Sequence, residues 1–159
     1  MKKIITTLFI SAMLQSCGSY LVDKKEVSQI PKGAKKIVIN SNYSSDSLFT
    51  IISKSFIREG WIIKSNKSSM QISAESKSVG HGTTLTPVVY IEGGKAYYSG
   101  EWGMDYKGQL MIYSFGGPSQ LKSEPIKFRR APSTKNDLAF QGLLLLAKKV
   151  PNSKITYEL

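Results

Sequence analysis

The chain has few cysteines, few histidines and little negative charge, and each shortage excludes a class of function. One cysteine, Cys17, in 159 residues excludes an intramolecular disulfide and a zinc site built from several thiolates. The one histidine, His81, has no accompanying Gly-x-Ser-x-Gly motif, which argues against a serine-triad enzyme. The acidic residues number 11 and are dispersed, without an EF-hand or His-Glu-x-x-His pattern. We therefore expect no metal site, no cofactor and no enzyme.

The uncharged run at the start of the chain is too short to span a membrane. Residues 4–14 follow Lys2 and Lys3 and carry no charge, but a transmembrane helix needs about 20 apolar residues. The order of charged, apolar and small residues is typical of a secretory signal peptide. We expect residues 1–16 to be a signal peptide that is removed.

The cysteine lies directly after this segment, in Leu14-Gln15-Ser16-Cys17. These four residues resemble the lipobox of bacterial lipoproteins, which has a leucine three positions before an invariant cysteine and a small residue one before it. The resemblance implies that the Cys17 thiol receives a diacylglyceryl group, that the peptide is cut before Cys17, and that fatty acids such as palmitate anchor the chain. Two or more acyl chains give stable membrane anchoring. The alternative is a secreted protein whose odd cysteine pairs with another chain.

The residue after the cysteine bears on which membrane holds the anchor. Gly18 resembles outer-membrane lipoproteins more than inner-membrane ones, which commonly carry aspartate at this position. We therefore expect a location in the cell envelope, with the outer membrane favoured over the inner membrane.

The remaining chain has the length of one domain. Residues 17–34 mix charges with Pro31 and Gly33 and show no sustained period, so we interpret them as a flexible tether. Residues 35–159 show no internal repeat and are expected to form a single domain.

The mature chain is strongly basic. The formal charge falls from +11 to +9 when Lys2 and Lys3 are removed with the signal peptide. In the cytoplasm such a charge indicates nucleic acid as a partner. In an envelope the polyanions are lipid head groups, lipopolysaccharide phosphates and acidic wall polymers. We expect partners among envelope proteins or anionic lipids, and no nucleic acid.

Hydrophobic patterning predicts alternating strands and two helices. Two helices are expected from N-cap chemistry and apolar spacing, one from Ser44 to Gly60 and one from Ser133 to Pro151. Strands are expected from β-branched or alternating residues, with Gly93-Gly94 as a hairpin turn. The expected strands are 36–40, one that begins at 61–63 and ends at a turn at 66–69, 70–74, 85–92, 96–102 and 110–115, an extended piece through 126–130, and a last strand near 155–157.

This order predicts an α+β fold in two layers, an antiparallel meander sheet with two helices packed on one face. Over roughly residues 35–150 the pattern resembles small α+β envelope lipoproteins in which a helix and a meander share a core. The likeness is one of fold pattern and carries no motif for a function.

Two clusters are candidate binding surfaces. Lys127, Arg129 and Arg130 form a dense basic run, which is either a possible anion contact or an ordinary solvated surface. Five aromatic residues concentrate in the central hairpin and form either a stacking surface or cross-strand pairs; they are Tyr90, Tyr97, Tyr98, Trp102 and Tyr106.

The sequence therefore predicts a lipid-anchored envelope lipoprotein with a binding or assembly role. One alternative is a carrier or binder of anionic lipid or lipopolysaccharide, which predicts an apolar cavity between the second helix and the sheet. Another is an envelope hydrolase, which predicts two or three titratable side chains together in a pocket.

Overall fold

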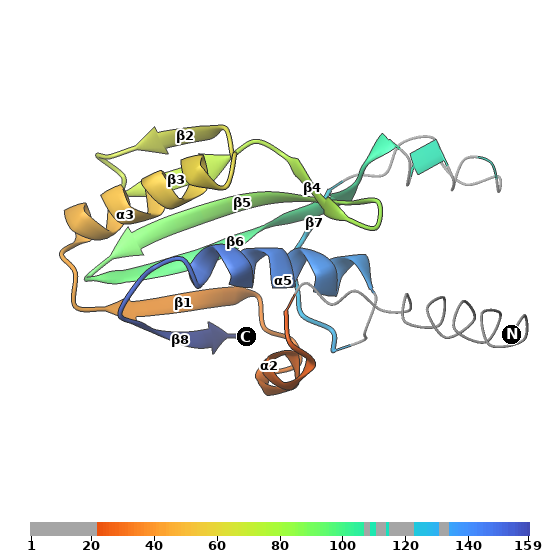
Figure 1. The fold of residues 1–159 in the computed structure, drawn as a ribbon, viewed down its shortest axis with the longest axis horizontal. Helices are drawn as coiled ribbons and strands as arrows, with labels where there is room; N and C mark the ends of the chain where they lie inside the picture. Colours follow the sequence, from red (N-terminus) through yellow and green to blue (C-terminus); the bar gives the residue numbers. More distant parts are fainter. Residues whose placement is uncertain (1–21, 107–108, 111–113, 115–122, 131–133) are drawn as a thin grey trace, which may run out of the picture.

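A single antiparallel sheet carries helices on one of its faces (Figure 1). The computed structural model describes residues 22–106, 109–110, 114, 123–130 and 134–159. The predicted fold class, α+β with two layers, is confirmed. The elements are α2 (Lys24–Gln29), β1 (Lys36–Ser41), α3 (Ser45–Arg58), β2 (Ile63–Asn66), β3 (Gln71–Ala74), β4 (Lys77–Gly80), β5 (Thr83–Glu92), β6 (Lys95–Met104), β7 (Glu124–Pro125), α5 (Lys135–Ala147) and β8 (Ser153–Glu158).

The strand order is β2-β3-β5-β6-β1-β8, with β4 paired to β5 and β7 paired to β6. Strands β2 to β6 follow one another as the predicted meander, while β1 and β8 extend the sheet beyond β6. Strand β4 was not foreseen, because its four residues KSVG show no β-branched run. The two outermost strands, β2 and β8, therefore lie at opposite edges of the sheet.

Helix α3 forms where the cap and the apolar spacing predict it. The Ser44 hydroxyl accepts a hydrogen bond from the backbone N–H of Ser47 at 3.3 Å, which satisfies one of the free donors of the first turn. Leu48, Ile52 and Phe56 follow at intervals of four residues and are fully buried against the sheet. Gly60 then takes a positive φ of 72° and ends the helix.

Helix α5 is buried along nearly its whole length, as its apolar sequence predicts. It lies across β5, β6 and β1 on the same face as α3 (Figure 1). The Phe140 ring lies 5.3 Å from the Phe128 ring and 6.2 Å from the Tyr157 ring, centroid to centroid. Phe140 therefore joins the helix to the segment that precedes it and to the strand that follows it.

The central hairpin of β5 and β6 contains a proline that a central strand usually excludes. Pro87 lies between the residues of β5 that pair with β3 and those that pair with β4, so neither strand is paired with it. On its other side it is opposite Gly100 of β6. Pro87 is thus tolerated in the middle of β5 because it lies at a gap in the pairing.

The expectation of a flexible tether at 17–34 differs from the structure in its described part. Residues 24–29 form α2, with Asp23 Oδ1 accepting from the Lys25 N–H at 2.8 Å. Val22, Ile30 and Ala34 belong to the hydrophobic core and are 6%, 0% and 0% exposed. The apolar side chains of this segment are buried because they close the core beside α5 and β8. Its residues 17–21 lie outside the described part.

The strand expected at 110–115 is wrong at its two described residues, Leu110 and Ser114. Tyr106, Gln109, Leu110 and Ser114 have helical backbone, and the Gln109 N–H donates to the Asp105 carbonyl at 2.9 Å. This i to i−4 bond is that of a helical turn. The other residues of the expected strand lie outside the described part.

Candidate functional site

The predicted lipid attachment point is close in sequence to the folded part of the chain. Cys17 and the predicted signal peptide, 1–16, lie outside the described residues. The first described residue, Val22, is already packed into the core. Within the described ranges, no helix is long and apolar enough to cross a membrane. Val22, a core residue, is therefore five positions after Cys17 in the sequence.

Residues 126–129 alternate between core and solvent, and Arg130, the last residue of the basic run 127–130, is exposed. The Lys127 N–H donates to Asn136 Oδ1 at 2.8 Å, and the Arg129 N–H donates to Asp137 Oδ1 at 2.7 Å. These bonds fix the segment to the first turn of α5, with Phe128 fully buried between them. The side chains of Lys127 and Arg129 are exposed.

Arg130 has a different role from its two neighbours in the run. Its φ is +56°, so the chain turns there. Its guanidinium Nη2 donates to the backbone carbonyls of Ser28 at 3.3 Å and Ile30 at 3.0 Å. These carbonyls are at the C-terminal end of α2, where free acceptors need partners. Arg130 therefore fixes the C-terminal end of α2 to the segment 127–130.

We predict that Arg130→Ala will loosen α2 selectively. The carbonyls of Ser28 and Ile30 lose a charged donor, which typically contributes about 1.5–3 kcal/mol when the groups are buried and less at an exposed site such as this one. Hydrogen exchange should become faster in residues 24–30 and stay unchanged in α3. Arg129→Ala is the matched control, because its side chain is exposed and its structural bond is made by the backbone. Equal exchange rates in both variants would contradict this role.

The aromatic residues of the central hairpin are divided between the two faces of the sheet. Tyr90 and Tyr97 face away from the helices as a cross-strand pair, with ring centroids 6.5 Å apart. Tyr98 and Trp102 point to the helical face, and Tyr98 is fully buried with its ring 6.4 Å from that of Phe56. Burial raises the pKa of Tyr98, so this hydroxyl stays neutral. Of the five predicted aromatic residues, the uncovered face therefore carries one pair, the exposed Tyr90 and the partly exposed Tyr97, and Tyr106 lies elsewhere, exposed after β6.

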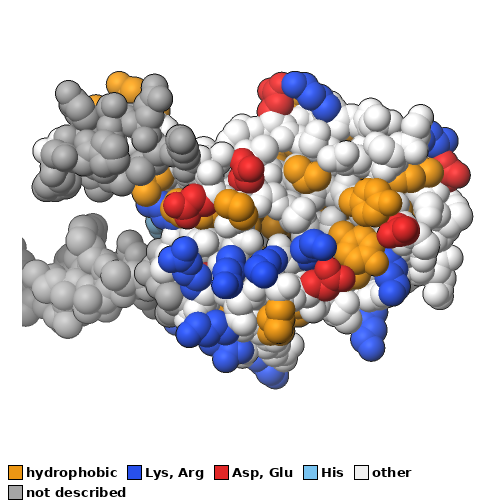
Figure 2. Space-filling view, turned by 180° about the vertical axis from the view of Figure 1, so that it is seen from behind, with side chains coloured by type: hydrophobic (Ala, Val, Ile, Leu, Met, Phe, Trp, Pro, Cys, Tyr) orange, Lys and Arg blue, Asp and Glu red, His pale blue; other side chains and the backbone are white. Residues whose placement is uncertain are grey.

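The face that carries this pair is not covered by helices (Figure 2). One row across it contains Gln71, Tyr90, Tyr97, Val38 and Thr156, and the ammonium of Lys36 lies 5.9 Å from the centre of the Tyr97 ring. Figure 2 shows apolar side chains over the middle of this face and Lys and Arg side chains crowded on its lower left part. The uncovered face thus offers both stacking and positive charge to a partner.

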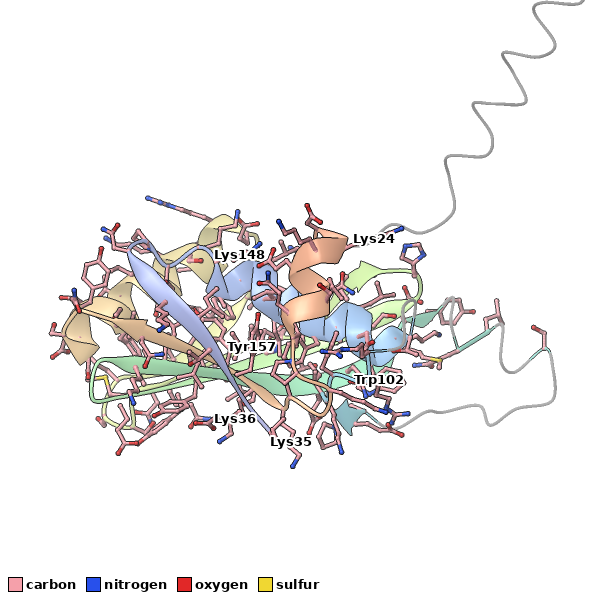
Figure 3. All side chains as sticks on the ribbon, turned by 90° about the horizontal axis from the view of Figure 1, so that it is seen from below. Lys24, Lys35, Lys36, Trp102, Lys148 and Tyr157 are labelled. Atoms are coloured by element: carbon pink, nitrogen blue, oxygen red, sulfur yellow. The ribbon has the colours of Figure 1, made fainter. Side chains whose placement is uncertain are left out.

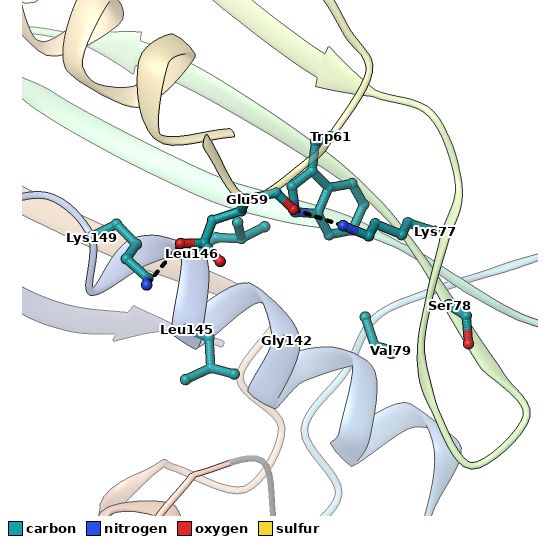
Figure 4. Close-up of a pocket in the computed structure, with 9 residues that line it drawn as sticks. All are labelled: Glu59, Trp61, Lys77, Ser78, Val79, Gly142, Leu145, Leu146 and Lys149. Carbon is teal, nitrogen blue, oxygen red and sulfur yellow. Dashed lines mark hydrogen bonds and ion pairs between the residues drawn. The ribbon is translucent and has the colours of Figure 1, made fainter. Parts of the chain in front are cut away.

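On the opposite side of the sheet, a small hollow lies between α5 and β4 (Figure 4). Its volume is about 190 Å³, and Trp61, Val79 and Leu146 contribute apolar walls. Sites that enclose drug-sized ligands typically hold about 300–1,000 Å³. The hollow is in the place that the carrier hypothesis predicts, and its volume is below this range.

The charged residues at this hollow are engaged with the protein. Lys77 Nζ donates to the Glu59 carbonyl at 2.6 Å and lies 5.4 Å from the centre of the Trp61 ring. Lys149 Nζ forms an ion pair with Glu59 Oε1 at 2.8 Å (Figure 4). The ammonium of Lys77 thus satisfies a carbonyl at the end of α3. The sequence contained no signal for this cluster, because three separate segments bring it together.

The remaining candidates for chemistry are dispersed. His81 is exposed at the turn between β4 and β5, with a φ of 51°. In the part of the chain that the structure describes, no group of three or more His, Cys, Asp or Glu side chains is placed to hold a metal ion.

Comparison of the chain with protein-family models, curated sequences and solved structures gives no match. The function is therefore argued from the residues and the surfaces described above.

Proposed function

We propose that this protein is a lipid-anchored lipoprotein of the cell envelope, with a non-catalytic binding or assembly role. The observation that carries the proposal is the sequence Leu14-Gln15-Ser16-Cys17 after a short charged and apolar segment. In the fold, Val22 is packed into the core, five positions after this cysteine, so the anchor would hold the domain close to the membrane. Gly18 favours the outer membrane.

The uncovered face of the sheet is the surface we assign to binding. It presents Tyr90 and Tyr97 beside Lys36, so it can stack on rings or apolar groups and attract anionic ones. Tyrosine is enriched at protein interfaces because it combines a large apolar body with a polar tip. An envelope protein or an anionic lipid fits this chemistry.

The anchor is tested with Cys17→Ala. We expect this variant to lose all incorporation of labelled fatty acid and to leave the membrane fraction, because no thiol remains to be acylated. The control is Ser16→Ala, which keeps a small residue before the cysteine and should be labelled and retained like the wild type. Unchanged membrane retention of the Cys17→Ala protein would contradict the proposal.

A further inference from the structure

Positive charge is concentrated on one edge of the sheet, which we call the α2 edge. It consists of residues 23–36, the segment 127–130, β8 and Lys148. Direct contacts join these parts. The Phe128 N–H donates to the Ala34 carbonyl at 2.8 Å, Lys36 forms an ion pair with Glu158 at 3.2 Å, and Lys148 forms one with Glu26. Figure 3 looks onto this edge, with Lys24 and Lys148 toward the helical layer and Lys35 and Lys36 toward the uncovered face.

Basic residues strongly outnumber acidic ones on the α2 edge. Three carboxylates, those of Asp23, Glu26 and Glu158, are outnumbered by ten basic residues. The ten are Lys24, Lys25, Lys32, Lys35, Lys36, Lys127, Arg129, Arg130, Lys148 and Lys154. The other described residues comprise eight basic and eight acidic ones. The excess positive charge of the described chain therefore lies on this edge, and the rest is balanced.

The α2 edge is held rigidly on the domain. Asp23 caps α2, Arg130 binds the carbonyls at the other end of the helix, and Ile30 is fully buried in the core. Tyr157 of β8 is half-buried, and burial and the nearby Glu26 carboxylate raise its pKa, so it stays neutral here. The charges are therefore carried by a fixed surface.

The α2 edge is also the part of the domain that the chain ties to Cys17. Val22 is five positions after Cys17, and five residues of fully extended chain span at most about 17 Å. Electrostatic attraction to an anionic membrane surface decays over a Debye length of about 8 Å at physiological ionic strength. An anchor at Cys17 would thus keep Val22, two positions before α2, within about two Debye lengths of the head groups.

We propose that the α2 edge docks on the anionic phospholipid head groups of the membrane that holds the anchor. This inference rests on the proposed acylation of Cys17. In the docked state the edge strand β8 and helix α2 face the bilayer, while β2 and β3, at the opposite edge of the sheet, point away from it. The uncovered face is then roughly perpendicular to the membrane plane and stays accessible to a partner.

A label on each edge tests the orientation. After acylation of Cys17, a cysteine introduced by Gln29→Cys on α2 or by Ser68→Cys in the β2–β3 turn is the one free thiol of the protein. Each full-length acylated protein is labelled with a fluorophore that an aqueous reductant quenches. It is then reconstituted in phosphatidylcholine vesicles with or without phosphatidylglycerol. We expect phosphatidylglycerol to slow the quenching of the α2 label several-fold and to leave the β2–β3 label unchanged, and added salt to abolish the difference.

Charge reversal supplies the second test. Lys25→Glu, Lys32→Glu and Lys35→Glu together replace three exposed lysines of the α2 edge. Each basic residue near such a surface contributes attraction, so most of the several-fold protection of the α2 label should be lost. The matched control, Lys54→Glu, Lys64→Glu and Lys95→Glu, makes the same change in net charge outside the edge and should retain the protection.

The outcomes separate the inference from the proposal on which it rests. If mass spectrometry finds no acyl chain on Cys17, both are overturned. If Cys17 is acylated but the α2 label is quenched equally in both kinds of vesicle, or both labels are protected alike, only the docking is overturned. Equal loss in the two triple variants would likewise overturn it, because net charge and not the α2 edge would then account for the attraction.

Discussion

Gly100→Ala should lower the free energy of unfolding by about 3 kcal/mol, at the upper end of the usual cost of overpacking. A β-carbon at Gly100 would lie 2.4 Å from the backbone carbonyl oxygen of Thr86 and 3.1 Å from the Cα of Pro87. Both atoms belong to the backbone of β5, the strand paired with it, so neither can rotate away. The two central strands would have to separate. Urea unfolding followed by circular dichroism measures the loss.

The control for this variant is Gly103→Ala, three residues further along the same strand. There the nearest atom to a new β-carbon is the Thr84 side-chain hydroxyl, at 3.0 Å, and this side chain can change rotamer. We expect a loss of about 1 kcal/mol or less. A comparable loss in the two variants would show that close approach of the β5 backbone is not the reason for glycine at position 100.

Phe140→Ala should be at least as damaging as Gly100→Ala. We expect it to lower the free energy of unfolding by about 3–5 kcal/mol. The Phe140 ring is fully buried and contacts Phe128 on one side and Tyr157 on the other. Its removal leaves a cavity between α5, the segment 126–130 and β8. Because that segment also binds α2 through Arg130, we expect hydrogen exchange in α2 to accelerate before the core of the sheet opens.

Leu145→Ala provides the control on the same helix. This side chain is 36% exposed, so its truncation removes less buried area, and alanine favours the helix. We expect a loss of about 1 kcal/mol or less by the same urea measurement. If Leu145→Ala were as destabilising as Phe140→Ala, the ring contacts of Phe140 would not explain the stability of this layer.

Local signals in the sequence were sufficient for much of the fold. The cap at Ser44, the spacing of Leu48, Ile52 and Phe56, and the turn at Gly93-Gly94 all act within a few residues, so the sequence predicts them directly. The position of Pro87 could not be predicted, because it depends on where β3 stops and β4 begins, and those strands come from another part of the chain.

Helix α2 was not predicted from the sequence, although the signals for its N-terminal end are present. Asp23 followed by Glu26 is a capping-box pattern, and Val22 and Val27 occupy the positions of a hydrophobic staple. A six-residue helix is too short to show the apolar period that identified the longer ones. Its stability comes from burial of Ile30 and from Arg130, which is 100 positions or more from the carbonyls that it binds.

The lipid attachment site and the α2 edge also differ in whether a local sequence pattern could predict them. A lipobox is a contiguous pattern, so Cys17 could be singled out from the sequence. The α2 edge is assembled from four separate segments, and the scattered lysines gave no sign of it. The anion contact predicted for Lys127, Arg129 and Arg130 stays a prediction. In the structure Arg130 binds backbone carbonyls, and seven other basic residues share the edge.

The most direct test of the central claim is the mass of the N-terminal peptide of the protein extracted from membranes. The account predicts a peptide that begins at Cys17 and carries a diacylglyceryl group on the thiol, with or without a further acyl chain on its amino group. A peptide that begins at another residue, or an unmodified Cys17 in the membrane-extracted protein, would contradict it.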